Sequence, residues 1–128
     1  MVQLVIWVQL LFMALAPAEN KAKISFDKTT HKLGNVFPGE EYQHTFTFTN
    51  TGTAPLVINN VETSCSCQVA EFSKEAIQPG SKGEIKVLFR PKKDSYGYVS
   101  KAFTVKSNAE NSIEYLYLTA TIVERAKK

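Results

Sequence analysis

The stretch EYQHTFTFTN, residues 41–50, alternates strictly between two kinds of side chain. Every second residue from Tyr42 to Phe48 carries an aromatic or imidazole ring, and the residues between them are Gln or Thr. Alternation of this kind, rich in aromatic and β-branched residues, is typical of a half-buried β-strand. The sequence Asn50-Thr51-Gly52 then predicts a turn, because Asn and Gly tolerate positive φ.

Segments of similar character recur along the chain, separated by turn residues such as Pro79-Gly80. The first expected strand, residues 24–36, is an edge strand in two pieces that is interrupted near Thr29-Thr30. The other expected strands are residues 41–50, 55–63, 68–72, 84–90, 99–107 and 113–124. About seven short strands without a convincing helical window predict an all-β fold, an Ig-like antiparallel β-sandwich, with an open β-barrel as the alternative.

The first 18 residues differ from the rest because they contain no charged side chain. An apolar run that ends in Ala16-Pro17-Ala18 indicates a signal peptide, although no Lys or Arg precedes the apolar segment. We therefore expect a leader at residues 1–18, a linker at 19–23, the Ig-like domain at 24–123 and a basic tail at 124–128. Export implies a periplasmic or secreted domain, with membrane contact only if the leader is retained as an anchor.

The charge distribution and motifs argue against two large classes of function. The net charge is only +3, and the basic residues are scattered apart from Lys92-Lys93 and the tail, so nucleic-acid binding is not expected. The pair Glu40-Glu41 follows Pro38-Gly39 and is interpreted as a solvated turn. Because the chain also lacks a phosphate-binding Gly-rich loop and a nucleophile elbow, we expect a protein that is not an enzyme and has no cofactor.

The stretch SCSCQ, residues 64–68, contains both cysteines of the chain, Cys65 and Cys67. In an extended strand their Cα atoms would be about 6.5–7 Å apart, at or beyond the usual limit for a disulfide, so bonding them requires a bend. A loop of three residues would add only about 1.6 kcal/mol of stability, so such a bond would serve redox chemistry better than stability.

The cysteine pair has three further interpretations. The two thiolates could bind a soft metal such as copper, which accepts few sulfur ligands. Zinc needs four ligands, and only His31, expected in a loop, and His44, expected to be partly buried in a strand, could add imidazole. Intermolecular disulfides and inert thiols also remain open.

Three longer stretches resemble the domain-of-unknown-function 1573 family: FTFTNTGTAPLVINNVETSCSC, IQPGSKGEIKVLFRP and GYVSKAFTVKSNAENSIEYLYLTATI. The family pattern is matched by Phe46, Phe48, Asn50, Gly52, Pro55, Leu56, Ile58, Ser64, Cys65, Cys67, Pro79 and Gly80. Family members usually have Gly between the two cysteines, where this chain has Ser66. The resemblance implies a small exported bacterial domain of Ig-like fold, without an assigned activity.

Two hypotheses for function follow from these observations. The first is a non-enzymatic binding or structural module of the cell envelope that engages a protein partner by a sheet edge, at residues 24–36, or by its loops. The alternative is a thiol redox or copper-handling protein that acts through the Cys65-x-Cys67 pair.

Overall fold

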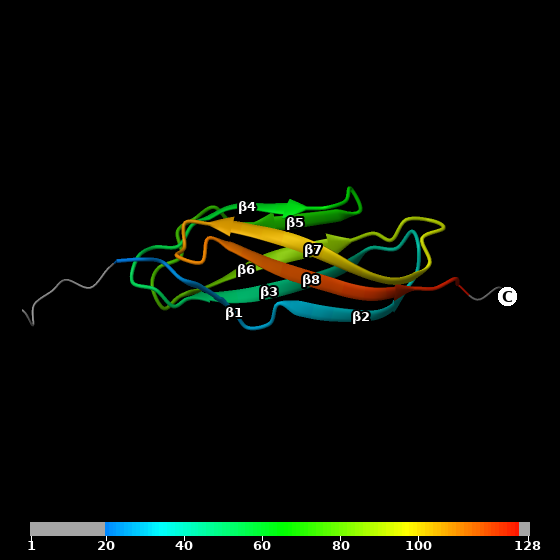
Figure 1. The fold of residues 1–128 in the computed structure, drawn as a ribbon, viewed down its shortest axis with the longest axis horizontal. Coiled ribbons are helices and arrows are strands. Elements are labelled where there is room, and N and C mark those ends of the chain that lie inside the picture. The colour runs from blue at the N-terminus through cyan, green and yellow to red at the C-terminus, as the bar shows by residue number, and fades with distance from the viewer. Residues whose placement is uncertain (1–19, 126–128) are drawn as a thin grey trace, which may run out of the picture.

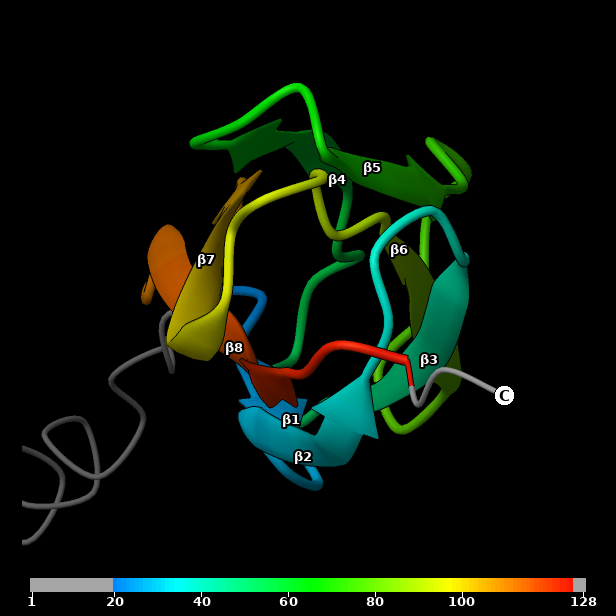
Figure 2. The ribbon, with the colours of Figure 1, turned by 90° about the vertical axis from the view of Figure 1, so that its right-hand side faces the viewer.

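The computed structural model describes residues 20–125, so the predicted leader and the last three residues of the predicted tail lie outside the described part. Within it, eight strands form two four-stranded sheets that face each other (Figures 1 and 2). Sheet A has the order β1-β3-β6-β5, and sheet B has the order β2-β8-β7-β4. The bounds are β1 Ile24–Phe26, β2 Thr30–Val36, β3 Tyr42–Asn50, β4 Ile58–Thr63, β5 Gln68–Phe72, β6 Lys82–Phe89, β7 Gly97–Ser107 and β8 Ile113–Ile122.

The predicted all-β sandwich is confirmed, since residues 20–125 contain no helix and the strands divide into two separate sheets. No segment of this range is a helix with the length and apolar character that a membrane crossing requires.

The core lies between the sheets and is built by alternation along the long strands. On sheet A, Phe46 and Phe48 point inward, and each is at most 2% exposed, as the pattern of residues 41–50 predicts. Sheet B contributes Phe103, Leu116 and Leu118, all fully buried. Burying one such side chain stabilises the fold by about 1.5–3 kcal/mol, which makes these two inner faces the main source of stability.

The pairing of β4 explains why apolar and polar residues do not alternate strictly in residues 55–63. Its pairing with β7 shifts register between Ile58 and Asn60, which indicates a bulge. The shift keeps both Ile58 and Val61 buried, although they are three positions apart and strict alternation would place them on opposite faces.

The N-terminal segment differs from the expected interrupted edge strand because its two pieces belong to different sheets. Strand β1 pairs antiparallel with β3 in sheet A, whereas β2 pairs parallel with β8 in sheet B. The chain bends at Asp27 and Thr29, and the Thr29 carbonyl then accepts a hydrogen bond from Tyr117 N–H at 2.8 Å, which commits the following residues to sheet B. The expectation of a loop at His31 is wrong for the same reason, because His31 lies in β2.

Candidate functional site

Cys65 and Cys67 lie in the turn that carries the chain from β4 in sheet B to β5 in sheet A. The structure joins them in a disulfide with a Cα–Cα distance of 5.2 Å. The required bend is present, because Gln68 N–H donates to the Cys65 carbonyl at 3.1 Å and closes the turn. Ser66 does not have positive φ, so the turn does not need the glycine usual in the resembled family.

The two cysteines differ in how firmly they are held. Cys67 is 8% exposed, and its carbonyl accepts the N–H of Arg90, the residue that follows β6, at 2.8 Å. The neighbouring Gln68 is also buried, and its Nε2 donates to the Ala102 carbonyl of β7, which links the two sheets at 2.8 Å. Cys65 is half-buried at the tip of the turn. An incoming thiol therefore has easier access to Cys65 than to Cys67.

A metal at this turn would need the reduced form of the pair, because thiolates and not disulfide sulfurs bind metal ions. Residues 20–125 contain no group of three or more His, Cys, Asp or Glu side chains placed to hold an ion. His31 and His44 contact each other, and they lie in β2 and β3, whereas the cysteine turn connects β4 to β5.

The imidazoles of His31 and His44 stack across the boundary between β2 and β3, which belong to different sheets. The ring centroids are 3.7 Å apart and the ring planes differ by 6°. Both residues are half-buried, as expected for His44. Burial lowers the pKa of His44, and the positive charges of His31 and Lys28 lower this pKa further.

The backbone of β3 is paired on both sides only near its end. Strand β1 pairs with Phe48, Thr49 and Asn50, while β6 pairs with β3 along nearly its whole length. Residues 42–46 therefore have a strand partner on the β6 side alone, and we call their other side the open edge. Since Thr47 O accepts Asp27 N–H on that side, alternation directs the N–H and C=O groups of Gln43 and Thr45 to the open edge as well.

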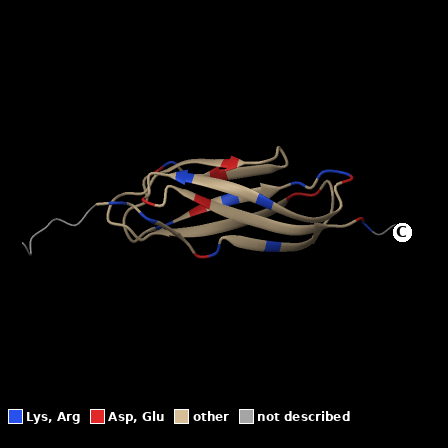
Figure 3. Cartoon of the chain, viewed as in Figure 1, with Lys and Arg blue, Asp and Glu red and all other residues tan. Residues whose placement is uncertain are grey.

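The carboxylates of the predicted turn at residues 38–41 are bound by arginines. Glu41 accepts two hydrogen bonds from Arg90, at 2.9 Å from Nε and 2.6 Å from Nη2, and these bonds lower the pKa of Glu41. Glu40 pairs with Arg125 and accepts the Tyr42 hydroxyl. More broadly, acidic and basic residues are interspersed over the described strands and loops (Figure 3).

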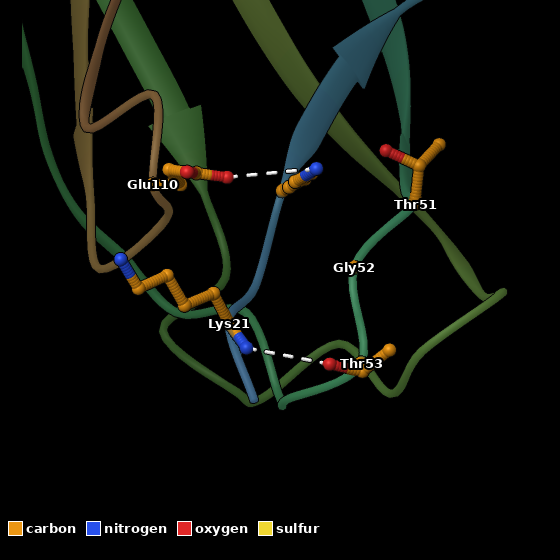
Figure 4. Close-up of a pocket in the computed structure, with 6 residues that line it drawn as sticks. Lys21, Thr51, Gly52, Thr53 and Glu110 are labelled. Carbon is orange, nitrogen blue, oxygen red and sulfur yellow. Dashed lines mark hydrogen bonds and ion pairs between the residues drawn. The ribbon is translucent and has the colours of Figure 1, made fainter. Parts of the chain in front are cut away.

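The turn after β3 holds the segment that precedes β1 (Figure 4). The carbonyls of Lys21 and Lys23 accept backbone N–H groups of Thr53 at 2.8 Å and Thr51 at 2.9 Å. Gly52 lies between them, and a Cβ there would be 2.7 Å from the Ala22 carbonyl carbon. The sequence indicated a turn here, but it did not reveal this contact with a segment 30 residues away.

Comparison with known proteins identifies a family and a fold. Residues 24–122 match a family described as "Protein of unknown function (DUF1573)". A search of curated proteins found no match. Solved structures of similar fold include a protein of unknown function from Porphyromonas gingivalis W83, with a TM-score of 0.71, 17% identity, and coverage of 84% of this chain and 50% of that one.

Two further structures share the fold. The ASH / PapD-like domain 7 of human CEP192 has a TM-score of 0.67 and 10% identity, with 88% of this chain and 93% of that domain covered. The secreted serine protease VesC from Vibrio cholerae has a TM-score of 0.62 and 19% identity, with 82% of this chain but only 24% of that one covered. This chain spans at most half the length of the Porphyromonas and Vibrio proteins, and likenesses at these identities show the fold alone.

Proposed function

Because the chain belongs to the DUF1573 family, whose description assigns no activity, we propose its function from the structure: it is a non-enzymatic, protein-binding module of the bacterial cell envelope. The predicted leader supports the location. The fold supports the class of function, because its strand edges and loops offer backbone groups and side chains to a partner protein.

The observation that carries the proposal is the open edge of β3. Gln43 and Thr45 direct backbone donors and acceptors away from β6, at a place where β1 has ended and β2 has crossed to sheet B. An extended segment of another protein can add to such an edge by backbone hydrogen bonds. The sequence-based hypothesis places the docking edge at residues 24–36; because these residues divide between the two sheets, we propose residues 42–46 of β3 as the docking edge instead.

Replacing Thr45 by proline tests the edge directly. Thr45→Pro removes an N–H that points away from β6, so the β3–β6 ladder keeps its hydrogen bonds and the fold tolerates the change. A partner strand loses one backbone hydrogen bond and meets the proline ring. With a photoreactive amino acid at Gln43, we expect cross-linked adducts from envelope preparations of the Thr45 protein, and at least about a tenfold lower yield with Thr45→Pro.

The matched control is Thr45→Val, which keeps the backbone N–H and a β-branched side chain and should cross-link like the parent protein. Placing the photoreactive residue at Thr104, on the outer face of sheet B, controls for general surface contacts. Equal adduct yields for Thr45→Pro and Thr45→Val would rule out binding through the open edge.

The disulfide favours a second candidate, thiol–disulfide exchange. A thiolate of a partner protein would attack Cys65 Sγ, break the S–S bond and release Cys67 as a thiolate, forming a mixed disulfide at Cys65. A second partner thiolate would then displace Cys65, which leaves the pair reduced and the partner oxidised. Cys65 is the expected point of attack because Cys67 is buried and its backbone is tied to Arg90.

Single serine variants measure this difference between the two sulfurs. Cys67→Ser leaves a half-exposed Cys65 thiol, and Cys65→Ser leaves a buried Cys67 thiol. We expect maleimide to react at least about ten times faster with the first variant, because thiol reactivity follows exposure. Equal rates, measured by intact mass over time, would contradict the assignment of Cys65 as the accessible sulfur.

A further inference from the structure

The His31–His44 stack lies at the boundary between the sheets, beside the open edge of β3. His44 is one of the residues 42–46 that lack a partner on that side, and His31 comes from β2, the strand that would otherwise have covered them. The His44 ring also contacts the Phe46 ring edge-on, with centroids 4.7 Å apart. The chain has two histidines in all, and both are in this contact.

The residues paired with the two histidines in the neighbouring strands are apolar, and the bend nearby carries one acidic and one basic residue. β8 places Leu118 opposite His31, and β6 places Val87 opposite His44. The bend between β1 and β2 contributes Asp27 and Lys28, of which Lys28 acts on His44 as a like charge.

The acidic groups on the β3 side are already bound. The Tyr42 hydroxyl accepts Phe37 N–H at 2.9 Å and donates to Glu40, which pairs with Arg125. Glu41 pairs with Arg90. Among residues 20–125, no carboxylate contributes to the pKa of His44. No described carboxylate therefore offsets positive charge on His44.

Two stacked imidazoles respond to protons in steps. Neutral rings 3.7 Å apart attract by contact, and one protonated ring can still face a neutral ring. Two protonated rings at this distance repel, and half-burial weakens the solvent screening that would otherwise reduce the repulsion. Protonation of both rings must therefore separate them.

We propose that the His31–His44 stack is a pH-sensitive latch that holds β2 against β3 at neutral pH and releases it in mildly acid surroundings, so that a partner strand can approach the open edge without β2 held beside it. The last part rests on the proposed function, as regulation of the same edge. The release itself is a property of the protein alone.

The direction of the pH dependence follows from the lowered pKa of His44. A histidine whose pKa is lower in the folded protein than in the unfolded chain binds fewer protons when folded. Its contribution to stability is complete above the unfolded value of about 6.5 and is lost as the pH falls below it. The latch is thus closed at pH 7.5 and opens towards pH 5.

Hydrogen exchange and imidazole NMR spectra of the purified protein test the latch. Between pH 7.5 and 5, after correction for intrinsic rates, we expect amide protection in β2 to fall at least about tenfold, while protection in β6 and β7 stays within a factor of two. The His44 signal should titrate at lower pH than that of an exposed histidine, because burial and the nearby charges lower its pKa. In His31→Gln, the His44 titration should move to higher pH.

The double variant His31→Gln with His44→Gln has no imidazole, so its β2 protection should not depend on pH in this range. Equal β2 protection at both pH values in the parent protein would overturn the latch, and so would the same loss in the double variant. The Gln43 cross-linking yield separates the two proposals. If β2 opens while Gln43 forms no adduct at either pH, the result supports the latch and contradicts binding at the open edge. If adducts form equally at both pH values, the result supports binding at the open edge and contradicts its regulation by the latch.

Discussion

Replacing Asn50 by alanine is expected to lower the free energy of unfolding by about 3–5 kcal/mol. The Asn50 side chain is fully buried and makes four hydrogen bonds to backbone groups. Its Oδ1 accepts from Gly52 N–H at 3.0 Å and Lys23 N–H at 3.3 Å. Its Nδ2 donates to the carbonyls of Ala54 at 2.8 Å and Ile77 at 2.9 Å.

The size of the effect comes from the groups that Asn50 would leave behind. Each of these hydrogen bonds contributes about 1 kcal/mol, and a buried backbone group that loses its partner costs about 1–3 kcal/mol more unless water or a small shift supplies another. The four partners come from the segment before β1, the turn after β3 and the loop before β6. Asn50 therefore joins three parts of the chain at one end of the sandwich.

Urea denaturation of Asn50→Ala and of the control Asn60→Ala would measure this difference. Asn60 is an exposed residue of β4, so its replacement should change stability by no more than about 0.5 kcal/mol. Asn50→Asp keeps the acceptor and loses both donors, so it should cost at least as much as Asn50→Ala at neutral pH. If Asn50→Ala lowers the free energy of unfolding by less than about 1 kcal/mol, the four hydrogen bonds of Asn50 do not contribute to stability as expected.

The sequence predicts the sandwich because the alternation of apolar and polar residues can be recognised within each strand alone. Alternation in residues 41–50 and 113–124 places Phe46, Phe48, Leu116 and Leu118 on inner faces, and the structure buries all four. The division of residues 24–36 was not predictable in the same way. Alternation shows that a segment is a strand, but its choice of sheet depends on a partner far along the chain, such as Tyr117 for Thr29. The polar sequence from Asp27 to Thr30 was the one available signal of a change of direction.

The candidate sites depend on the same long-range pairings. The spacing of Cys65 and Cys67 required a bend, and the turn supplies it, but the buried Gln68 that fixes the turn to Ala102 could not be found from spacing. The sequence offers His31 and His44 only as possible imidazole ligands for zinc at the cysteines. Their contact arises only because β2 leaves sheet A, so a periodicity argument that kept residues 24–36 in one strand could not predict it.

Replacing Gly52 by alanine is expected to cost about 3 kcal/mol and to release the N-terminal segment from the turn after β3. A Cβ at this position would meet the Lys21 carbonyl oxygen and lie 2.5 Å from the Lys23 nitrogen. Both are backbone atoms, which cannot move aside as a flexible side chain would. The chain must separate there, and the hydrogen bonds to Thr51 and Thr53 break while Ala22 and Ile24 leave the core.

Two controls distinguish this clash from other effects of a substitution in a turn. Thr51→Ala alters an exposed neighbour and should change stability by no more than about 0.5 kcal/mol. Gly34→Ala has open space around the new Cβ but a φ of +78°, so it should cost only about 1 kcal/mol, through backbone strain alone. In Gly52→Ala, hydrogen exchange should show the amides of Thr51 and Thr53 unprotected while β7 and β8 remain protected. If Gly52→Ala costs no more than Gly34→Ala, the close approach of the two segments does not limit the residue at position 52.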